Sequence, residues 1–265
     1  MPTPPQPGPR SAPSGRSRFV SGGALTAWVN SWLRGAVAYD AVVAAVHDAG
    51  ILTVRGLPEH PDPAPVGWAL SAVRSCGGGP LRFVLPVAGD IRGVPGVPGL
   101  SATAITAGQL VVGPALAFLP DDNPSADGGW LAMDVSGAAP VTATPGDQQT
   151  VSQASGALRL AVRAATDALT VLDVARCNSG VESLTRREQA VLLPPDHDPS
   201  AAALATRCAQ LTAILDLAMA DAPGGALNSY GAGGRDAALR RLSGAVREAL
   251  MCAFSWMPVS RTVDR

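Results

Sequence analysis

The sequence contains no lysine, and all 20 of its basic side chains are arginine. A P-loop needs a lysine to reach the phosphates of its nucleotide, so the sequence excludes nucleotide binding through that motif. None of the glycine-rich segments has the G-x-G-x-x-G spacing of a dinucleotide site. Arginine without lysine, beside abundant alanine, glycine and proline, indicates a GC-rich bacterial genome rather than a special role for arginine.

An excess of either charge is also lacking. The 20 basic and 21 acidic residues give a formal net charge of −1, so nothing indicates nucleic acid or an anionic membrane as a partner. The uncharged segment Leu100–Leu119 has the length of a transmembrane helix, but Gly113 and Pro114 in its middle favour two short strands. We therefore predict no nucleic-acid partner and no membrane span.

Cysteine is scarce and scattered, and there is no C-x-x-C pair. The four cysteines are Cys76, Cys177, Cys208 and Cys252. A secreted disulfide framework is denser and shorter, so we expect reduced, mostly buried thiols and a cytoplasmic protein. The first 18 residues have no apolar core typical of a signal peptide and are predicted to be a disordered tail.

Catalytic groups are few. The segment Gly99–Thr103 is faintly similar to a nucleophile elbow around Ser101, but Thr103 replaces the second glycine and would crowd the turn. The candidate bases are His47, His60 and His197. None of them has a predicted partner that would orient it, so the pattern does not favour serine hydrolysis.

Two acidic segments have the composition of metal sites without the required geometry. Asp121–Asp127 has oxygens at the first four positions of a calcium loop, but it lacks the central glycine and has Ala132 in place of the bidentate glutamate. In Asp196–Asp198, neighbouring side chains rarely converge on one ion, and Asp198 is predicted to cap a helix. We predict no metal and no cofactor.

The first half of the chain is predicted to be an α/β (α+β) unit with a small mixed sheet. Apolar spacing predicts helices at 25–33, 39–49, 66–75 and 101–108, and strands at 51–54, 81–87, 110–112, 115–119 and 130–135. Ser101 is the expected N-cap of the fourth helix. Because 51–54 and 81–87 flank a helix, we expect one βαβ unit in which they are parallel neighbours.

The second half is predicted to contain three main α-helices. Apolar residues step by four and three over 158–172, 204–218 and 239–253. A short helix is expected at 184–193, and 138–149 has the composition of a linker. The expected organisation is therefore a tail at 1–18, an α/β domain at 19–140 and a helical domain at 150–258.

Two segments are candidate ligand sites. Asp90 and Arg92 are the charged residues of the loop 88–101, which follows a predicted parallel strand and ends at Ser101. The glycine-rich turn 224–235 contains the two remaining candidates, Asn228 and Arg235, before the last predicted helix, where backbone N–H groups favour an anion. The alternative for both segments is a structural loop.

These observations leave two hypotheses. The first is a non-catalytic protein that contacts another chain or a second copy of itself through Phe254, Trp256 and Met257, which are residue types enriched at interfaces. The same three side chains could instead close the base of the helical unit. The second hypothesis is a small-ligand binder or enzyme that uses the loop 88–101 and the turn 224–235. Scarce catalytic groups favour the first.

Overall fold

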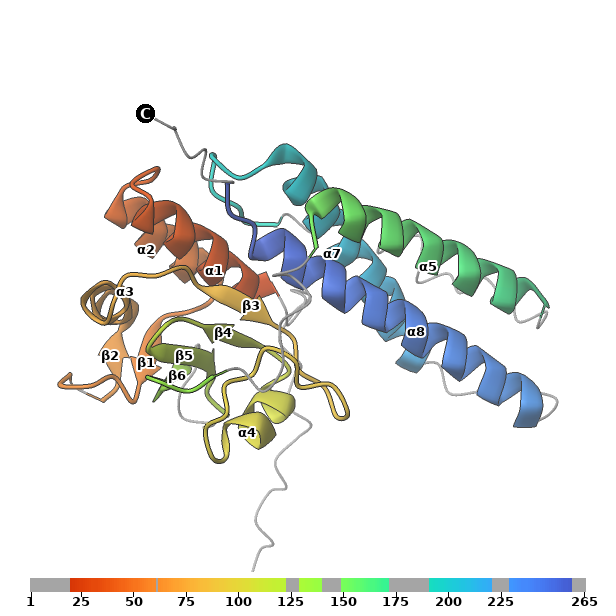
Figure 1. The fold of residues 1–265 in the computed structure, drawn as a ribbon, viewed down its shortest axis with the longest axis horizontal. Helices are drawn as coiled ribbons and strands as arrows, with labels where there is room; N and C mark the ends of the chain where they lie inside the picture. The colour runs from red at the N-terminus through yellow and green to blue at the C-terminus, as the bar shows by residue number, and fades with distance from the viewer. Residues whose placement is uncertain are drawn as a thin grey trace, which may run out of the picture.

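The computed structural model describes residues 20–60, 62–122, 129–139, 149–171, 191–220 and 229–258. In this part of the chain, a mixed six-stranded sheet with its helices forms an α/β unit, and three long helices form a second unit beside it (Figure 1). The predicted fold class is therefore confirmed. The predicted tail, most of the linker 138–149, the centre of the calcium-like loop and residues 184–190 lie outside the described residues.

The α/β unit contains helices α1 Val20–Leu33, α2 Tyr39–Asp48, α3 Val66–Ser75 and α4 Leu100–Ala107, and strands β1 Thr53–Arg55, β2 Ala64–Pro65, β3 Arg82–Val84, β4 Leu110–Val112, β5 Leu116–Pro120 and β6 Gly129–Asp134. The helical unit contains α5 Val151–Val171, α7 Pro199–Ala220 and α8 Ser229–Phe254. Helix α8 lies between α5 and α7, which have few contacts with each other. Both α5 and α8 begin several residues before the predicted apolar stripes at 158–172 and 239–253.

The strand order corrects one prediction. The sheet runs β2-β1-β6-β5-β4-β3, with β1 parallel to β6 and every other described pair antiparallel. The prediction that 51–54 and 81–87 are parallel neighbours is wrong, because three strands separate them. Antiparallel strands joined by short connections pair locally, so β4, β5 and β6 form a meander that takes the central positions. The predicted pairing of 115–119 with 130–135 is confirmed.

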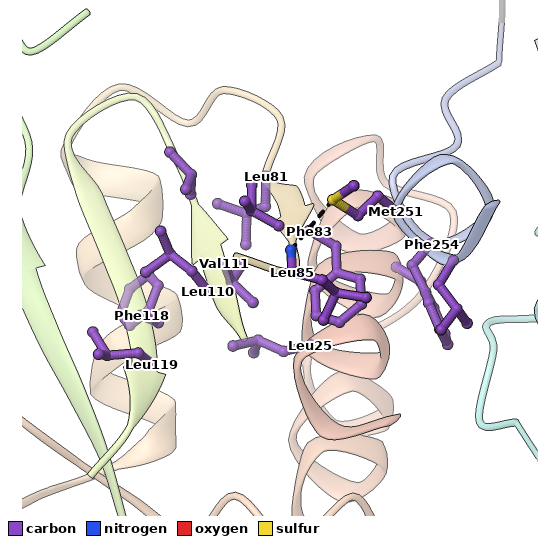
Figure 2. Packing of buried hydrophobic residues seen from close by; sticks show 14 of the residues in the cluster. Leu25, Leu81, Phe83, Leu85, Leu110, Val111, Phe118, Leu119, Met251 and Phe254 are labelled. Carbon is purple, nitrogen blue, oxygen red and sulfur yellow. Dashed lines mark hydrogen bonds between the residues drawn. The ribbon is translucent and has the colours of Figure 1, made fainter. Parts of the chain in front are cut away.

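Side chains seal the outer edge of β3. An unpaired edge strand presents N–H and C=O groups on which another strand can pair. Every second residue here has its N–H satisfied by a side chain instead: Leu81 by Asn30 Oδ1 at 2.7 Å, Phe83 by Ser255 Oγ at 2.8 Å, and Leu85 by Met251 Sδ at 3.2 Å. Figure 2 shows the last of these contacts beside the aromatic core. Helices α1 and α8 thus replace the missing neighbouring strand.

The two units share one hydrophobic core, and Phe254 joins them. Its side chain is 1% exposed and packs edge-on against Phe83, with 5.5 Å between ring centroids and 81° between planes. Helix α1 approaches the same ring so closely that a Cβ on Gly23 would lie 2.6 Å from it. The prediction that Phe254 is an interface residue is wrong, because the last turn of α8 buries it between α1 and the sheet.

The sequence predicts two N-cap residues, and the first turns of α7 and α4 show whether each one caps its helix. Asp198 Oδ1 accepts a hydrogen bond of 2.9 Å from the N–H of Ala201, which confirms Asp198 as the N-cap of α7. Ser101 is not a cap: Gly99 occupies that position with φ of 80°, and α4 begins at Leu100. Glycine adopts this left-handed conformation without strain, so the cap lies two residues earlier than the sequence indicated.

The three described cysteines are free, and two of them are buried. Burial raises the pKa of the Cys208 thiol to about 12, so this sulfur stays protonated at neutral pH. Cys76 at the end of α3 is exposed, so the expectation of burial does not hold for it. Cys177 lies outside the described residues.

One described helix, α7, is long and apolar enough over Pro199–Met219 to cross a membrane by length and composition alone. About a third of that window, 33%, is buried inside the protein. The core helix of a soluble protein passes the same test, so one such helix is weak evidence. The uncharged segment Leu100–Leu119 forms α4, β4 and most of β5 instead of one helix.

Candidate functional site

The predicted ligand residues Asp90 and Arg92 form part of a charge network that ties their loop to α8. Arg92 donates to both oxygens of Asp90, with Nε–Oδ1 at 2.8 Å and Nη2–Oδ2 at 2.7 Å. Arg92 also donates to Glu248 Oε1 at 2.7 Å, and Arg247 donates to Asp90 Oδ2. The two cations and two anions of this network balance, and together they hold the loop against α8.

This network predicts a loss of stability at acidic pH. Asp90 has its pKa lowered from 3.8 to about 2, chiefly by the side-chain hydrogen bond from Arg92 and against the opposing effect of burial. The stabilisation is therefore present above about pH 4 and is lost as the pH falls toward 2. The shift of the pKa corresponds to a free energy on the order of 2 kcal/mol, and solvent screens it little because Asp90 is only partly exposed. Urea unfolding of the wild type and Asp90→Asn at pH 6, 4 and 2 measures it. The difference between the two proteins should shrink as the pH falls, and a constant difference would contradict the assignment.

The other predicted ligand residues do not join Asp90. Ser101 is half-buried in the first turn of α4. Arg235 lies inside α8, where its Nη2 donates a 2.6 Å hydrogen bond to the Ala218 carbonyl near the end of α7. The prediction that Arg235 flanks a helix N-terminus is wrong, because α8 begins at Ser229 and includes the second half of the glycine-rich turn. Asn228 lies outside the described residues.

The segment Asp196–Asp198 anchors α7 rather than a metal. Asp196 accepts a 2.6 Å hydrogen bond from Arg34, which directly follows α1. His197 is 8% exposed, its Nε2 lies 3.0 Å from the Ala253 carbonyl, and burial lowers its pKa, so the ring is neutral and donates from Nε2 at neutral pH. The described residues include no group of three side chains that could hold a metal ion.

A cleft of about 1040 Å³ opens between the α/β unit and the start of the helical unit. One wall is β3 with the turn between β4 and β5. The opposite wall is made by the first turns of α5 and α7, and the last turn of α8 with the residues after it closes one end. A volume of this size is at the upper end of ordinary ligand sites and is large enough for a peptide segment.

The cleft is positively polarised. Two helices begin at it, and each helix N-terminus carries a partial positive charge from its free N–H groups. Helix α5 has no acidic residue in its first turn, and Thr150 caps it by accepting a 3.2 Å hydrogen bond from the Gln153 N–H. Arg82 and Arg159 line the cleft, and Asp198 is the acidic side chain among the described lining residues.

Trp256 and Met257 form the apolar end of the cleft. Trp256 packs edge-on against His197 with 5.3 Å between centroids, and the guanidinium of Arg34 lies 5.9 Å from the indole centroid. Arg34 also donates to Met257 Sδ at 3.2 Å. These contacts hold the two side chains at the surface, and Met257 is 37% exposed. Two of the three predicted interface residues therefore line a cleft.

Sequence reasoning did not find Arg82 or Arg159 as site residues. Arg82 lies on an edge strand, and Arg159 lies two turns into α5, so no motif connects them. Of the features that form the cleft, the sequence indicated only a helix start, because Asp198-Pro199 is the pattern of an N-cap followed by the first turn of α7. The cleft forms when distant segments pack, which no local pattern describes.

Two family models match the chain. The model described as the Rv1486c-like protein, N-terminal domain, matches residues 22–144, and the one described as its C-terminal domain matches residues 152–251. The uncharacterized protein Rv1486c of Mycobacterium tuberculosis is 30% identical over 87% of this chain and 94% of its own length. The uncharacterized protein MAV321 of Mycobacterium avium is 27% identical over 72% of this chain and 76% of its own length. No solved structure matches the chain.

Proposed function

The chain belongs to the family of Rv1486c-like proteins, and we propose that it is a non-catalytic protein that binds an acidic segment of another protein in the cleft between its two units. The observation that carries this proposal is the cleft itself. Its volume of about 1040 Å³ combines the positive groups Arg82, Arg159 and the N-terminus of α5 with an apolar end at Trp256 and Met257.

Charge and side-chain type support an acidic partner segment. Complementary charge brings partners together and selects among them, and the exposed Arg159 needs no rearrangement to meet a carboxylate. Tryptophan and methionine are enriched at the cores of interfaces, and tryptophan is among the residue types that most often dominate the binding energy. Two arginines opposite one aspartate are too few for the phosphate backbone of a nucleic acid, which supports a polypeptide.

The groups near the cleft support a binding role rather than catalysis. Cys252 lines the cleft, but burial raises the pKa of its thiol, and the sulfur donates to the Gln149 carbonyl at 3.4 Å. A protonated thiol is a poor nucleophile. His197 is the nearby base, and its Nε2 is already engaged by the Ala253 carbonyl.

We also propose that the protein works in the cytosol of a GC-rich bacterium. The widely spaced free cysteines support a reducing compartment, and the use of arginine without lysine supports the genome composition. A second copy of the chain is the alternative partner. The binding test below separates the two partners, because binding of a peptide leaves the oligomeric state of the protein unchanged.

Charge reversal at Arg159 should weaken binding of an acidic peptide. The probe is a fluorescein-labelled peptide of about twelve residues that alternates glutamate and leucine, and its lysine counterpart is the reference. We expect Arg159→Glu to weaken binding about tenfold, which is about 1.4 kcal/mol. Fluorescence anisotropy at low and physiological salt measures the affinity.

Arg163→Glu is the matched control, because Arg163 is exposed one turn further along α5 and does not line the cleft. This variant makes the same change in net charge and should leave the affinity at physiological salt within about twofold, because Arg163 does not line the cleft and salt weakens the remaining long-range effect. Equal binding of both peptides, or equal loss in both variants, would refute the proposal. Dimers detected by light scattering without peptide would favour the second copy.

A further inference from the structure

Exposed apolar side chains gather around the first turn of α3. Trp68 in that turn is 48% exposed, and Tyr39 at the start of α2 is 42% exposed. The Tyr39 hydroxyl lies over Gly67, where a Cβ would be 2.5 Å from its oxygen, so the phenol is held beside the residue that precedes Trp68. Leu52 is also exposed, and its carbonyl accepts a 3.1 Å hydrogen bond from the Val66 N–H at the start of α3. Neighbouring exposed apolar side chains of this kind mark interaction surfaces.

Other side chains hold the two aromatic rings in place. The His60 ring lies beside Trp68, with 4.7 Å between centroids and 38° between planes. Tyr39 packs against the buried Trp32 at 5.9 Å, and the guanidinium of Arg74 lies 4.5 Å from the Trp32 ring. Rings that are already fixed lose little entropy when a ligand covers them. We call Tyr39, Leu52, His60 and Trp68 the aromatic patch.

The composition of the aromatic patch selects a class of ligand. Proline-rich segments bind to surfaces lined by aromatic rings, because the polyproline II helix is preformed and loses little entropy on binding. Two exposed carboxylates flank the patch, since Asp40 follows Tyr39 and Glu59 precedes His60. Complementary charge therefore favours a ligand that also carries arginine.

The chain itself contains a segment of this chemistry. Residues 1–19 lie outside the described residues, and their sequence has prolines at positions 2, 4, 5, 7 and 9, which include two P-x-x-P spacings. Arg10 follows the last of these prolines, and residues 1–19 include no acidic side chain. We propose that the segment Pro2–Pro9 docks on the aromatic patch of its own chain, with Arg10 beside the carboxylates of Asp40 and Glu59.

The length of the intervening chain fits docking within one molecule. Helix α1 begins at Val20, and its 14 residues span about 21 Å. Figure 1 shows α1 running from beside β3 toward α2, so the aromatic patch lies beyond the C-terminal end of α1. The ten residues 10–19 span about 31 Å as a polyproline II helix. They are therefore long enough to follow α1 along its whole length and to continue past it.

NMR relaxation of the ¹⁵N-labelled full chain tests the docking. In the wild type we expect backbone order parameters of about 0.6 or more at Thr3, Gln6 and Gly8, where a free chain end gives lower values. Trp68→Ala should lower these order parameters below about 0.6, because losing the indole reduces the ratio of docked to free segment about tenfold. Trp68 is half exposed, so this variant is expected to fold.

A variant of the segment gives the reciprocal measurement. Pro5→Gly combined with Pro7→Gly removes the rigid P-x-x-P spacing and should shift the amide signals of Gly67 and Trp68. This double variant changes no described residue, so it decides the question even if Trp68→Ala fails to fold.

Leu160→Ala is the matched control, because Leu160 on α5 is a large exposed side chain outside the aromatic patch. It should leave the order parameters of Thr3, Gln6 and Gly8 unchanged. Wild-type order parameters below about 0.6, or an equal loss in Trp68→Ala and Leu160→Ala, overturn the proposal. Docking that weakens on tenfold dilution would assign the segment to a second copy and also overturn it. The proposal for the cleft is unaffected, since no residue of the aromatic patch lines it.

Discussion

Replacing Phe254 by alanine is expected to lower the free energy of unfolding by about 3–5 kcal/mol. The ring is 1% exposed, packs edge-on against Phe83 and fits directly over the backbone at Gly23. Its removal would leave a cavity that neither the rigid sheet nor helix α1 can close. Because this ring joins the two units, we expect the loss to affect both together, as one transition shifted to lower urea concentration. Circular dichroism during urea denaturation measures the shift.

Trp256→Ala is the matched comparison. Trp256 follows Phe254 closely in the chain but lies half-buried at the cleft, so its loss should destabilise the protein less and weaken binding of the acidic peptide more. The two substitutions thereby separate core from interface within one short segment. A Phe254→Ala protein that melts like the wild type would show that the ring is not part of the shared core.

Asn30→Ala is expected to cost about 2–4 kcal/mol. The Asn30 side chain is 1% exposed and imitates a neighbouring strand: its Oδ1 accepts from the Leu81 N–H at 2.7 Å, and its Nδ2 donates to the Leu81 carbonyl at 2.8 Å. Alanine would leave two buried backbone groups unpaired, and each costs about 1–3 kcal/mol. Thermal and urea unfolding give the magnitude.

Ser255→Ala is the reference with which the loss of stability in Asn30→Ala is compared. Ser255 satisfies one N–H of the same strand from a partly buried position, so its loss should cost about 1 kcal/mol. Asn30→Ala should also aggregate more readily near its melting temperature, because the edge of β3 becomes available to another chain. If both substitutions had the same small effect, the bonds of Asn30 to Leu81 would not be what holds α1 against the sheet.

Local physical chemistry in the sequence determined most of the elements. Helix α3 spans Val66–Ser75 as predicted, because apolar residues recur at helical spacing and the glycines after it cannot continue a helix. The start of α7 followed from Asp198 and the proline after it, since a cap and its helix are adjacent in sequence. The pairing of β5 with β6 also followed, because a short connection favours antiparallel neighbours.

Tertiary structure alone decided which strand pairs with β1, which residues the charged loop contacts and where the cleft forms. Strand β1 pairs with β6 because the meander of β4, β5 and β6 occupies the centre of the sheet, a choice that depends on the whole sheet rather than on spacing. Asp90 and Arg92 were predicted to bind a ligand, yet they meet Arg247, which is far from them in sequence. Helical and strand periods report which face of each element is buried. They carry no information on which distant element covers that face. The residues of the cleft come together only when those distant elements pack against each other.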